Sequence, residues 1–357
     1  MDGKRLENLL VAMERVGATA LHLVPGRTPM LRVQRRFVAG DETALVRDDV
    51  AELTRDLLFS DHRELLQQQG HVEVLYRARN GRRYRAAVAE SDGEPALVLR
   101  PVPDVPPRLT TLELPPQVAA QTRARNGLVV VAGFFGSGKS TTIAAMVEEL
   151  NQDPARHVVT IEDAIQFVHQ SGAALLHQRE VGTHVATAHE GVRQAMASGA
   201  DVVVVSEVRD GKSLDAAIAA AESGCLVIVG VEAGSIVGAI SELTSMVPIE
   251  DRPRLRTRLA RTLRACLAQS LLHRSHRAGR IPVVEVLVGT APVRSVIRKG
   301  TLQELLLIMQ KCRGLGMQTT DVALRSLLAR HLVTPDEALL HATSREEVLA
   351  RAPSAAR

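Results

Sequence analysis

The chain has 357 residues, of which 45% are hydrophobic and 24% charged, and its net charge at pH 7 is +4. This composition is that of a globular protein and excludes wholesale disorder and a fibrous protein. The length predicts two or three domains. Aromatic residues make up only 2% of the chain and Trp is absent, so we expect aliphatic cores and little stacking on single-stranded nucleic acid. The small charge excess also argues against a dedicated nucleic-acid binder.

The cysteine and histidine patterns indicate no structural metal or disulfide framework. The three cysteines form no C-x-x-C pair, and the twelve histidines show no metal-ligand spacing. No apolar signal segment is evident at the N-terminus. The longest apolar stretch, 226–240, contains Glu232 and is too short to span a bilayer. We therefore expect a cytoplasmic protein.

The first hundred residues predict a small α+β domain. Its expected elements are a helix over 4–16, a pair of short strands over 20–38, a helix over 48–69, and strands over 71–78, 83–90 and 96–101 with turns at Asn80-Gly81 and Asp92-Gly93. A dense run of prolines between 101 and 116 follows. It predicts a semi-rigid linker and a domain boundary.

From Leu128 onward, near-continuous Val, Ile and Leu runs alternate with helical segments, which predicts a buried and mainly parallel sheet. The expected strands are 128–132, 157–161, 174–177, 202–206 and 226–231. After about residue 250 we expect mostly helix, interrupted by one strand over 281–288. The last dozen residues are expected to be frayed.

Residues 133–140, GFFGSGKS, match the phosphate-loop pattern G-x-x-x-x-G-K-[ST] in full, between the strand LVVVA and the helix TTIAAMVEELN. Glycines allow successive amides to face an anion, and the helix N-terminus adds positive charge. Lys139 is expected to reach the β and γ phosphates of ATP, and the Ser140 hydroxyl to bind Mg²⁺. The predicted nucleotide-binding residues are Gly133, Gly136, Ser137, Gly138, Lys139, Ser140 and Thr141.

Acidic residues follow two of the expected strands. Glu207 ends the run DVVVVSE, which resembles a Walker B strand. We predict that Glu207 holds the water shell of Mg²⁺ or polarises the attacking water. Glu162 and Asp163 end the run VTIED and could contact Mg²⁺ or the nucleotide. Without further context, such an acidic pair is better explained as ordinary surface charge.

Several longer segments resemble the secretion-ATPase superfamily of type II/IV secretion and type IV pili, and within it the PilT and PilU pilus-retraction motors. The segments are HVVTIEDAIQFVHQS (157–171), HQREVG (177–182), ADVVVVSEVRDGKSLDAAIAAAESGCLV (200–227), ATALHLVPGRTPMLRV (18–33), PPRLTTLELP (106–115), TAPVRSVIRKG (290–300) and GLGMQTTDVAL (314–324). Their order matches that of the family, and together they extend over roughly residues 5 to 345.

The resemblance implies an α/β fold with a PAS-like α+β domain at 1–100, a hinge-like linker at 101–116, a RecA-like P-loop ATPase core at 117–288 and a C-terminal helical region at 289–357. It also implies a ring-shaped homo-hexamer, or a mixed hexamer with a paralogous motor, whose ATP site is completed by a neighbouring subunit. ATP-driven domain closure would then turn an inner-membrane platform protein and dismantle the pilus. The implied location is cytoplasmic, peripheral to the inner membrane at the pilus base.

By position, Arg85 and Arg100 are candidates for arginines that act in trans on the phosphates of a neighbour. Each could instead be simply a salt-bridge partner at a strand edge. Six arginines between 252 and 264 form a basic stretch on an expected helix, which is typical of a solvated face. The resemblance implies further roles: the stretch could line the ring pore or a subunit interface, or it could contact acidic lipid or the platform protein. These six are Arg252, Arg254, Arg256, Arg258, Arg261 and Arg264.

The sequence departs from the family pattern at positions that the resemblance assigns to ATP hydrolysis. Gln166 replaces the glutamate of the family's Asp box, the implied general base, and an amide can orient a water but cannot accept its proton. Glu232 stands where the family's His box has histidine. The binding residues Lys139, Ser140 and Glu207 are kept.

Three hypotheses remain open on these residues. The first is a divergent but active P-loop retraction ATPase. The second is a weakly or non-hydrolysing accessory subunit that works with an active motor, in the manner of PilU. The third, a P-loop hexamer that translocates nucleic acid, is disfavoured because aromatics are few and the resemblance is specific to pilus ATPases, so no nucleic acid is expected. The catalytic candidates are Lys139, Glu207, Glu162, Gln166 and Glu232, with Ser140 and Glu207 at the metal.

Overall fold

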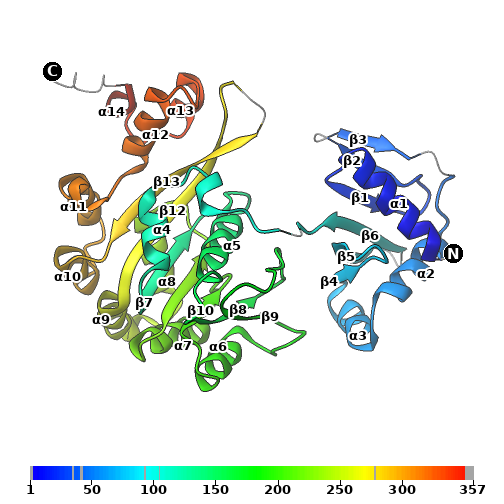
Figure 1. The fold of residues 1–357 in the computed structure, drawn as a ribbon, viewed down its shortest axis with the longest axis horizontal. Coiled ribbons are helices and arrows are strands. Elements are labelled where there is room, and N and C mark those ends of the chain that lie inside the picture. The colour runs from blue at the N-terminus through cyan, green and yellow to red at the C-terminus, as the bar shows by residue number, and fades with distance from the viewer. Residues whose placement is uncertain are drawn as a thin grey trace. The chain divides into compact units, whose positions relative to one another are not determined.

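The computed structural model describes residues 3–33, 36–40, 43–91, 94–103, 105–276 and 279–349. The chain divides into two compact units, which Figure 1 draws as ribbons. The first unit comprises Met1–Val105 and Ala164–His169, and the second comprises Pro106–Asp163 and Gln170–Arg357. The predicted turn at Asp92-Gly93 lies outside the described residues. Of the last dozen residues, which we expected to be frayed, 346–349 belong to a short helix, and 350–357 lie outside the described residues.

The first unit contains one antiparallel sheet with the strand order β3-β2-β1-β6-β5-β4. Its elements are α1 (Gly3–Arg15), β1 (Ala20–Leu23), β2 (Met30–Val33), β3 (Arg36–Ala39), α2 (Arg47–Leu57), α3 (Ser60–Gln69), β4 (His71–Arg77), β5 (Arg83–Ser91) and β6 (Glu94–Pro101). Side chains along β4 and β6 alternate between buried and exposed, so one sheet face carries the core. Leu10 and Met13 of α1 and Leu53 of α2 are buried in this core.

Two expectations for this unit were too simple. The expected pair of strands over 20–38 is three strands, because β3 adds to the edge of β2. The expected helix over 48–69 is two helices, since the backbone of Leu58 and Phe59 is extended. The break allows Leu57 and Leu58 to be buried together in the core, which an uninterrupted amphipathic pattern does not indicate.

The second unit is built on a seven-stranded sheet with the order β13-β12-β7-β11-β10-β8-β9. Neighbouring strands run parallel except for β12 and β13. The strands are β7 (Gly127–Ala132), β8 (His157–Glu162), β9 (Leu175–Glu180), β10 (Val202–Val205), β11 (Leu226–Val231), β12 (Leu263–His273) and β13 (Arg280–Val288). This confirms the buried, mainly parallel sheet that the apolar runs predicted.

Helices cover both faces of this sheet (Figure 1). The helices of this unit are α4 (Pro116–Thr122), α5 (Lys139–Leu150), α6 (Ala188–Ala197), α7 (Gly211–Glu222), α8 (Ile236–Ser245), α9 (Arg252–Thr262), α10 (Ala291–Lys299), α11 (Glu304–Lys311), α12 (Thr320–Ala329), α13 (Pro335–Leu340) and α14 (Arg345–Leu349). Leu128 and Val130 of β7 pack with α6 to α10, whereas Val129 and Val131 pack with α4 and α5. Alternate residues of one strand therefore serve two cores.

Strand β12 corrects a prediction. We expected residues 263–273 to be helical, because the run is rich in Leu and Ala. The structure instead inserts it between β7, to which it runs parallel, and β13, to which it runs antiparallel. Pairing on both sides overrides the local preference for helix. Arg264 consequently lies on a strand, not on the helix that carries the other five arginines of the basic stretch.

None of the helices in the described ranges combines the length and the apolar character that a membrane span requires.

A close backbone approach fixes the end of β11 against the chain that leaves β10. A Cβ atom at Gly230 would overlap the carbonyl oxygen of Ser206, and the amide of Val208 donates to the Gly230 carbonyl over 2.9 Å. We predict that Gly230→Ala lowers the free energy of unfolding by about 2–3 kcal/mol, as in other overpacked sites. Urea denaturation followed by circular dichroism measures this. The control Gly314→Ala adds a methyl with no heavy atom within 4 Å, and an equal effect of both changes would contradict the prediction.

Candidate functional site

The predicted phosphate loop connects β7 to α5 in the geometry that the motif requires. Gly136 and Gly138 have φ values of 81° and 85°, the left-handed region that favours glycine. A Cβ atom at Gly133 would overlap the Ser137 side chain. These three positions therefore need glycine for backbone reasons, which agrees with their prediction as loop residues.

The loop forms a cradle for an anion. Helix α5 begins at Lys139 without a side-chain cap, so the amides of its first turn, which includes Ser140 and Thr141, have no acceptor inside the helix. The Ser137 hydroxyl is buried and has no hydrogen-bond partner among the described residues. Lys139 is 8% exposed. Unsatisfied donors around a buried lysine at a helix N-terminus fit the phosphates of a nucleotide.

Two residues that the sequence analysis missed position this loop from the neighbouring strands. Gln269 of β12 is 5% exposed. Its Nε2 donates to the Ser137 carbonyl over 2.8 Å, and its Oε1 accepts from Thr142 Oγ1 of α5 over 2.7 Å. Arg280 of β13 donates to the Gly136 carbonyl over 3.2 Å. The polar Gln269 within the largely apolar run CLAQSLL was a signal, but the expected helix hid its place beside the loop.

Charged side chains from three strand ends meet beside the loop. Glu207, which follows β10, lies with Oε2 3.3 Å from Lys139 Nζ. Arg209 bridges the two acids, with Nη2 2.9 Å from Asp163 Oδ2 and Nε 3.7 Å from Glu207 Oε1. The structure thus brings together Lys139 and Glu207, as predicted, and adds Arg209 and Asp163 to them.

Asp163 is the electrostatically unusual member of this group. Burial raises the pKa of its carboxyl above the ordinary range, and nearby Glu207 adds to the rise, whereas Arg209 and Lys139 oppose it. The Asp163 amide donates to Ser206 Oγ over 3.2 Å, which ties the end of β8 to the chain that leaves β10. The Asp163 side chain is exposed, yet its ion pair with Arg209 and its backbone contact with Ser206 distinguish it from an unpaired surface charge.

The remaining catalytic candidates are Glu162, Gln166 and Glu232, and each has a different setting. Glu162 accepts from Thr160 Oγ1 over 2.7 Å and from Gln178 Nε2 over 3.0 Å, so its carboxylate is bonded within β8 and β9. Gln166 is exposed and lies in the segment Ala164–His169, which belongs to the first unit. Glu232 is exposed and follows β11 directly. Its strand reaches the loop, since the Gly133 amide donates to the Val231 carbonyl over 3.2 Å.

Arg85 and Arg100 are directly opposite each other in the β5–β6 register. Their chain neighbours Tyr84 and Leu99 are buried in the core. Because successive side chains of a strand point to opposite faces, Arg85 and Arg100 lie on the sheet face away from the core. Arg85 lies 3.7 Å from the Glu73 carboxylate and donates to the Ala164 carbonyl over 3.3 Å. A salt-bridge role for Arg85 is thus present, and action in trans stays a prediction for both.

The contact between Arg209 and Asp163 leads to a pH-dependent prediction. Because Arg209 opposes the rise of the Asp163 pKa, Arg209→Ala should raise that pKa further. A raised acid pKa gives stability at low pH that is lost as pH rises through the folded value. The melting temperature of Arg209→Ala should therefore fall further below wild type at about pH 7 than at about pH 4. In the Asp163→Asn background this pH dependence should be much smaller, because only the contact of Arg209 with Glu207 remains, and an undiminished pH dependence there would refute the assignment.

The comparisons with known proteins agree with this geometry. A family model described as "Type II/IV secretion system protein" matches residues 109–331. The type IV pilus retraction ATPase PilT of Pseudomonas aeruginosa is 30% identical over 333 residues, which cover 93% of this chain and 96% of PilT. The type IV pilus ATPase PilU of the same species is 29% identical, over 96% of this chain and 90% of PilU. The crystal structure of the pilus retraction motor PilT with bound ADP matches with a TM-score of 0.87 at 29% identity, over 96% of this chain and 98% of that chain.

These matches confirm the expected fold, an N-terminal α+β domain followed by a P-loop ATPase core. The family model covers more than half of the chain, and PilT aligns over nearly all of it. The chain therefore belongs to the type II/IV secretion system protein family, in which it is similar to the type IV pilus ATPases PilT and PilU.

Proposed function

We propose that this protein is an ATP-binding motor subunit of a type IV pilus, which couples ATP binding and hydrolysis to pilus retraction. The observation that carries the proposal is the anion cradle between β7 and α5, with its unpartnered Ser137 hydroxyl and the buried Lys139 beside Glu207. The names of the relatives supply the process, since PilT is a retraction ATPase. A bound ADP in the PilT crystal structure supports a nucleotide as the ligand.

In this proposal each residue of the cradle has a separate task. The amides of the first turn of α5 bind phosphate oxygens, and Lys139 exchanges part of its contact with Glu207 for the β and γ phosphates. The Ser140 hydroxyl and Glu207 hold Mg²⁺, directly or through its water shell. When bound, Mg²⁺ offsets the negative charge that develops on the phosphates.

The position of the general base distinguishes the two leading hypotheses. Gln166 can orient a water molecule without accepting its proton. Glu232 is the alternative carboxylate, because it follows a strand that hydrogen-bonds to the start of the loop. If Glu232 accepts the proton, the protein is an active motor. If neither residue does, it is an accessory subunit that binds ATP and works with an active retraction ATPase, as the similarity to PilU also suggests.

The proposal extends to assembly and location. We infer a ring hexamer, either of this chain alone or mixed with a paralogous motor, in which Arg85 and Arg100 reach the phosphates of a neighbour. The hexamer would work in the cytoplasm against an inner-membrane platform protein at the pilus base. What supports these steps is the similarity to PilT and PilU over most of the chain. A nucleic-acid translocase has no specific observation in its favour.

Single-turnover phosphate release tests the proposed reaction. We predict that wild type binds a fluorescent ATP analogue and releases phosphate slowly, and that Gln166→Glu raises the rate by about 10²-fold, because it restores a proton acceptor. Lys139→Ala should abolish nucleotide binding and sets the background. Loss of the wild-type rate in Glu232→Gln would assign the base to Glu232. Absence of nucleotide binding by wild type would refute the proposed function.

The contacts of Gln269 lead to a second prediction. Gln269→Glu keeps the acceptor for Thr142 but removes the donor to the Ser137 carbonyl, so the loop is held less firmly. The affinity for the ATP analogue should fall about tenfold, which corresponds to about 1.4 kcal/mol. Gln318→Glu is a matched control, since Gln318 Nε2 donates over 2.8 Å to the Val284 carbonyl, outside the loop. An equal loss of affinity in the two variants would show that only general stability is affected.

A further inference from the structure

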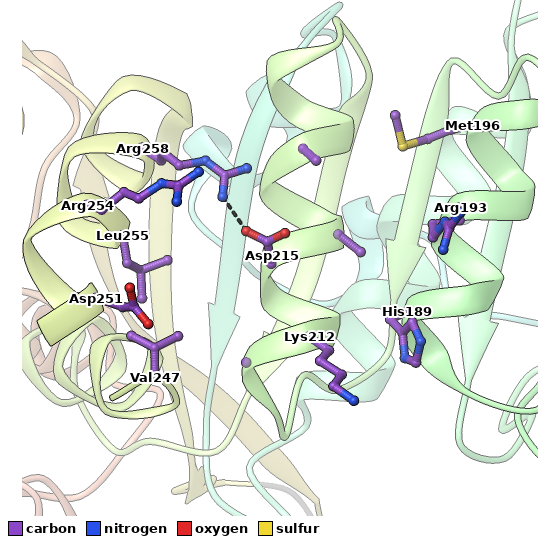
Figure 2. Close-up of a pocket in the computed structure, with 13 residues that line it drawn as sticks. His189, Arg193, Met196, Lys212, Asp215, Val247, Asp251, Arg254, Leu255 and Arg258 are labelled. Carbon is purple, nitrogen blue, oxygen red and sulfur yellow. Dashed lines mark hydrogen bonds and ion pairs between the residues drawn. The ribbon is translucent and has the colours of Figure 1, made fainter. Parts of the chain in front are cut away.

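A groove on the second unit lies outside the phosphate loop and its charged neighbours. It has a volume of about 690 Å³ and runs over α7, between α6 and α9 (Figure 2). Its lining contains none of the residues that we assign to nucleotide binding or hydrolysis. The groove therefore needs an explanation of its own.

Small side chains on α7 leave the groove open. Ala216 and Ala219 lie one helical turn apart on the surface of α7 and form the middle of the floor. Met196 of α6 and Leu255 of α9 line the floor on either side. The floor is thus an apolar strip that follows a helix, bordered by two more helices.

Cationic side chains surround this strip. Four cations line the groove, against the two carboxylates of Asp215 and Asp251. Arg258 is neutralised, because it pairs with Asp215 and, over 2.9 Å, with Glu222. The other three cations come from three different helices, and the structure gives their side chains no hydrogen bond or salt bridge with any described residue. They are Arg193 of α6, Lys212 of α7 and Arg254 of α9.

We propose that this groove binds an acidic amphipathic helix of a partner protein. An apolar strip flanked by unpaired cations is complementary to a helix with apolar residues at i, i+3, i+4 and i+7 and with Asp or Glu on both sides of them. The small residues at 216 and 219 allow the close approach of such a helix. The cations on α6 and α9 set its orientation and speed its association, whereas the apolar floor provides most of its affinity.

Two other occupants fit these observations less well. A membrane surface is flat and presents headgroups, so it would contact the cationic rim and leave the recessed apolar floor unused. Nucleic acid binds through phosphate contacts combined with stacking on aromatic residues, and no Phe, Tyr or Trp lines the groove. This groove also explains part of the basic stretch at 252–264, because Arg254 and Arg258 both line it and extend from α9 toward α7 (Figure 2).

Fluorescence anisotropy with a designed peptide tests the proposal on the full-length protein. The probe is a fluorescein-labelled helix of about 18 residues with a Leu stripe flanked by Glu, and its control has the same composition in scrambled order, without an apolar face. The ordered peptide should bind at least about tenfold more tightly than the scrambled one, and added salt should weaken its binding. Equal binding of the two peptides, or no binding of either, would overturn the proposal.

Variants of the groove separate its charge from its floor. Arg193→Glu with Arg254→Glu should weaken peptide binding at least about tenfold, and Ala219→Phe should weaken it without a change of charge. Arg123→Glu with Arg298→Glu changes two exposed arginines that do not line the groove and should leave binding unchanged. Each variant is first checked for binding of the ATP analogue, which reports on the other site and on folding.

Two further measurements exclude the competing occupants. Cosedimentation with vesicles of phosphatidylcholine and phosphatidylserine tests the lipid surface. Analytical ultracentrifugation tests whether the groove is a contact between copies of this chain. If the groove variants abolish vesicle binding, or change the oligomeric state, while peptide binding is unaffected, the proposal is wrong. The proposal stands if the variants lose only the ordered peptide.

Discussion

The site depends on strand β7, which must be buried on both faces and paired along both edges to place the phosphate loop. Its six residues are completely buried, with alternate side chains in two separate cores. Parallel pairing with β11 and β12 directs its carboxyl end toward the ends of its neighbours. The loop that follows is then fixed by backbone hydrogen bonds from one side and by Gln269 from the other. The anion cradle at the end of β7 is therefore held by rigid strands on both sides.

The electrostatics of the site follow from the same convergence of strand ends. Lys139 is buried beside Glu207, and Arg209 joins Glu207 to Asp163. These two cations and two acids balance in the absence of nucleotide. An incoming polyphosphate adds negative charge and must redistribute these contacts, so nucleotide binding is coupled to the ends of β8 and β10. The groove over α7 has the opposite charge pattern. Three of its cations lack partners among the described residues, so its positive charge is not balanced.

The sequence predicted what depends on local pattern. The apolar runs gave the parallel strands, and the phosphate-loop motif gave the glycines, Lys139 and Ser140 with their helix. It failed where distant segments decide the structure. Residues 263–273 have the composition of a helix and become a strand only because β7 and β13 pair with them. Gln269 and Arg209 were missed for the same reason, since their partners are identifiable only when strands distant in sequence are neighbours.

The strand order has a consequence for how the protein is made. β7 needs β12 on one side, and Gln269 of β12 contacts Ser137, which lies 132 residues earlier in the chain. When only the first 250 residues have been synthesised, the nascent chain contains the whole phosphate-loop motif but lacks β12, the strand that positions it. Contacts of such long sequence separation form late in folding. Nucleotide binding should accordingly arise as a late event in synthesis, and fragments that end before residue 263 should lack it even though their motif is intact.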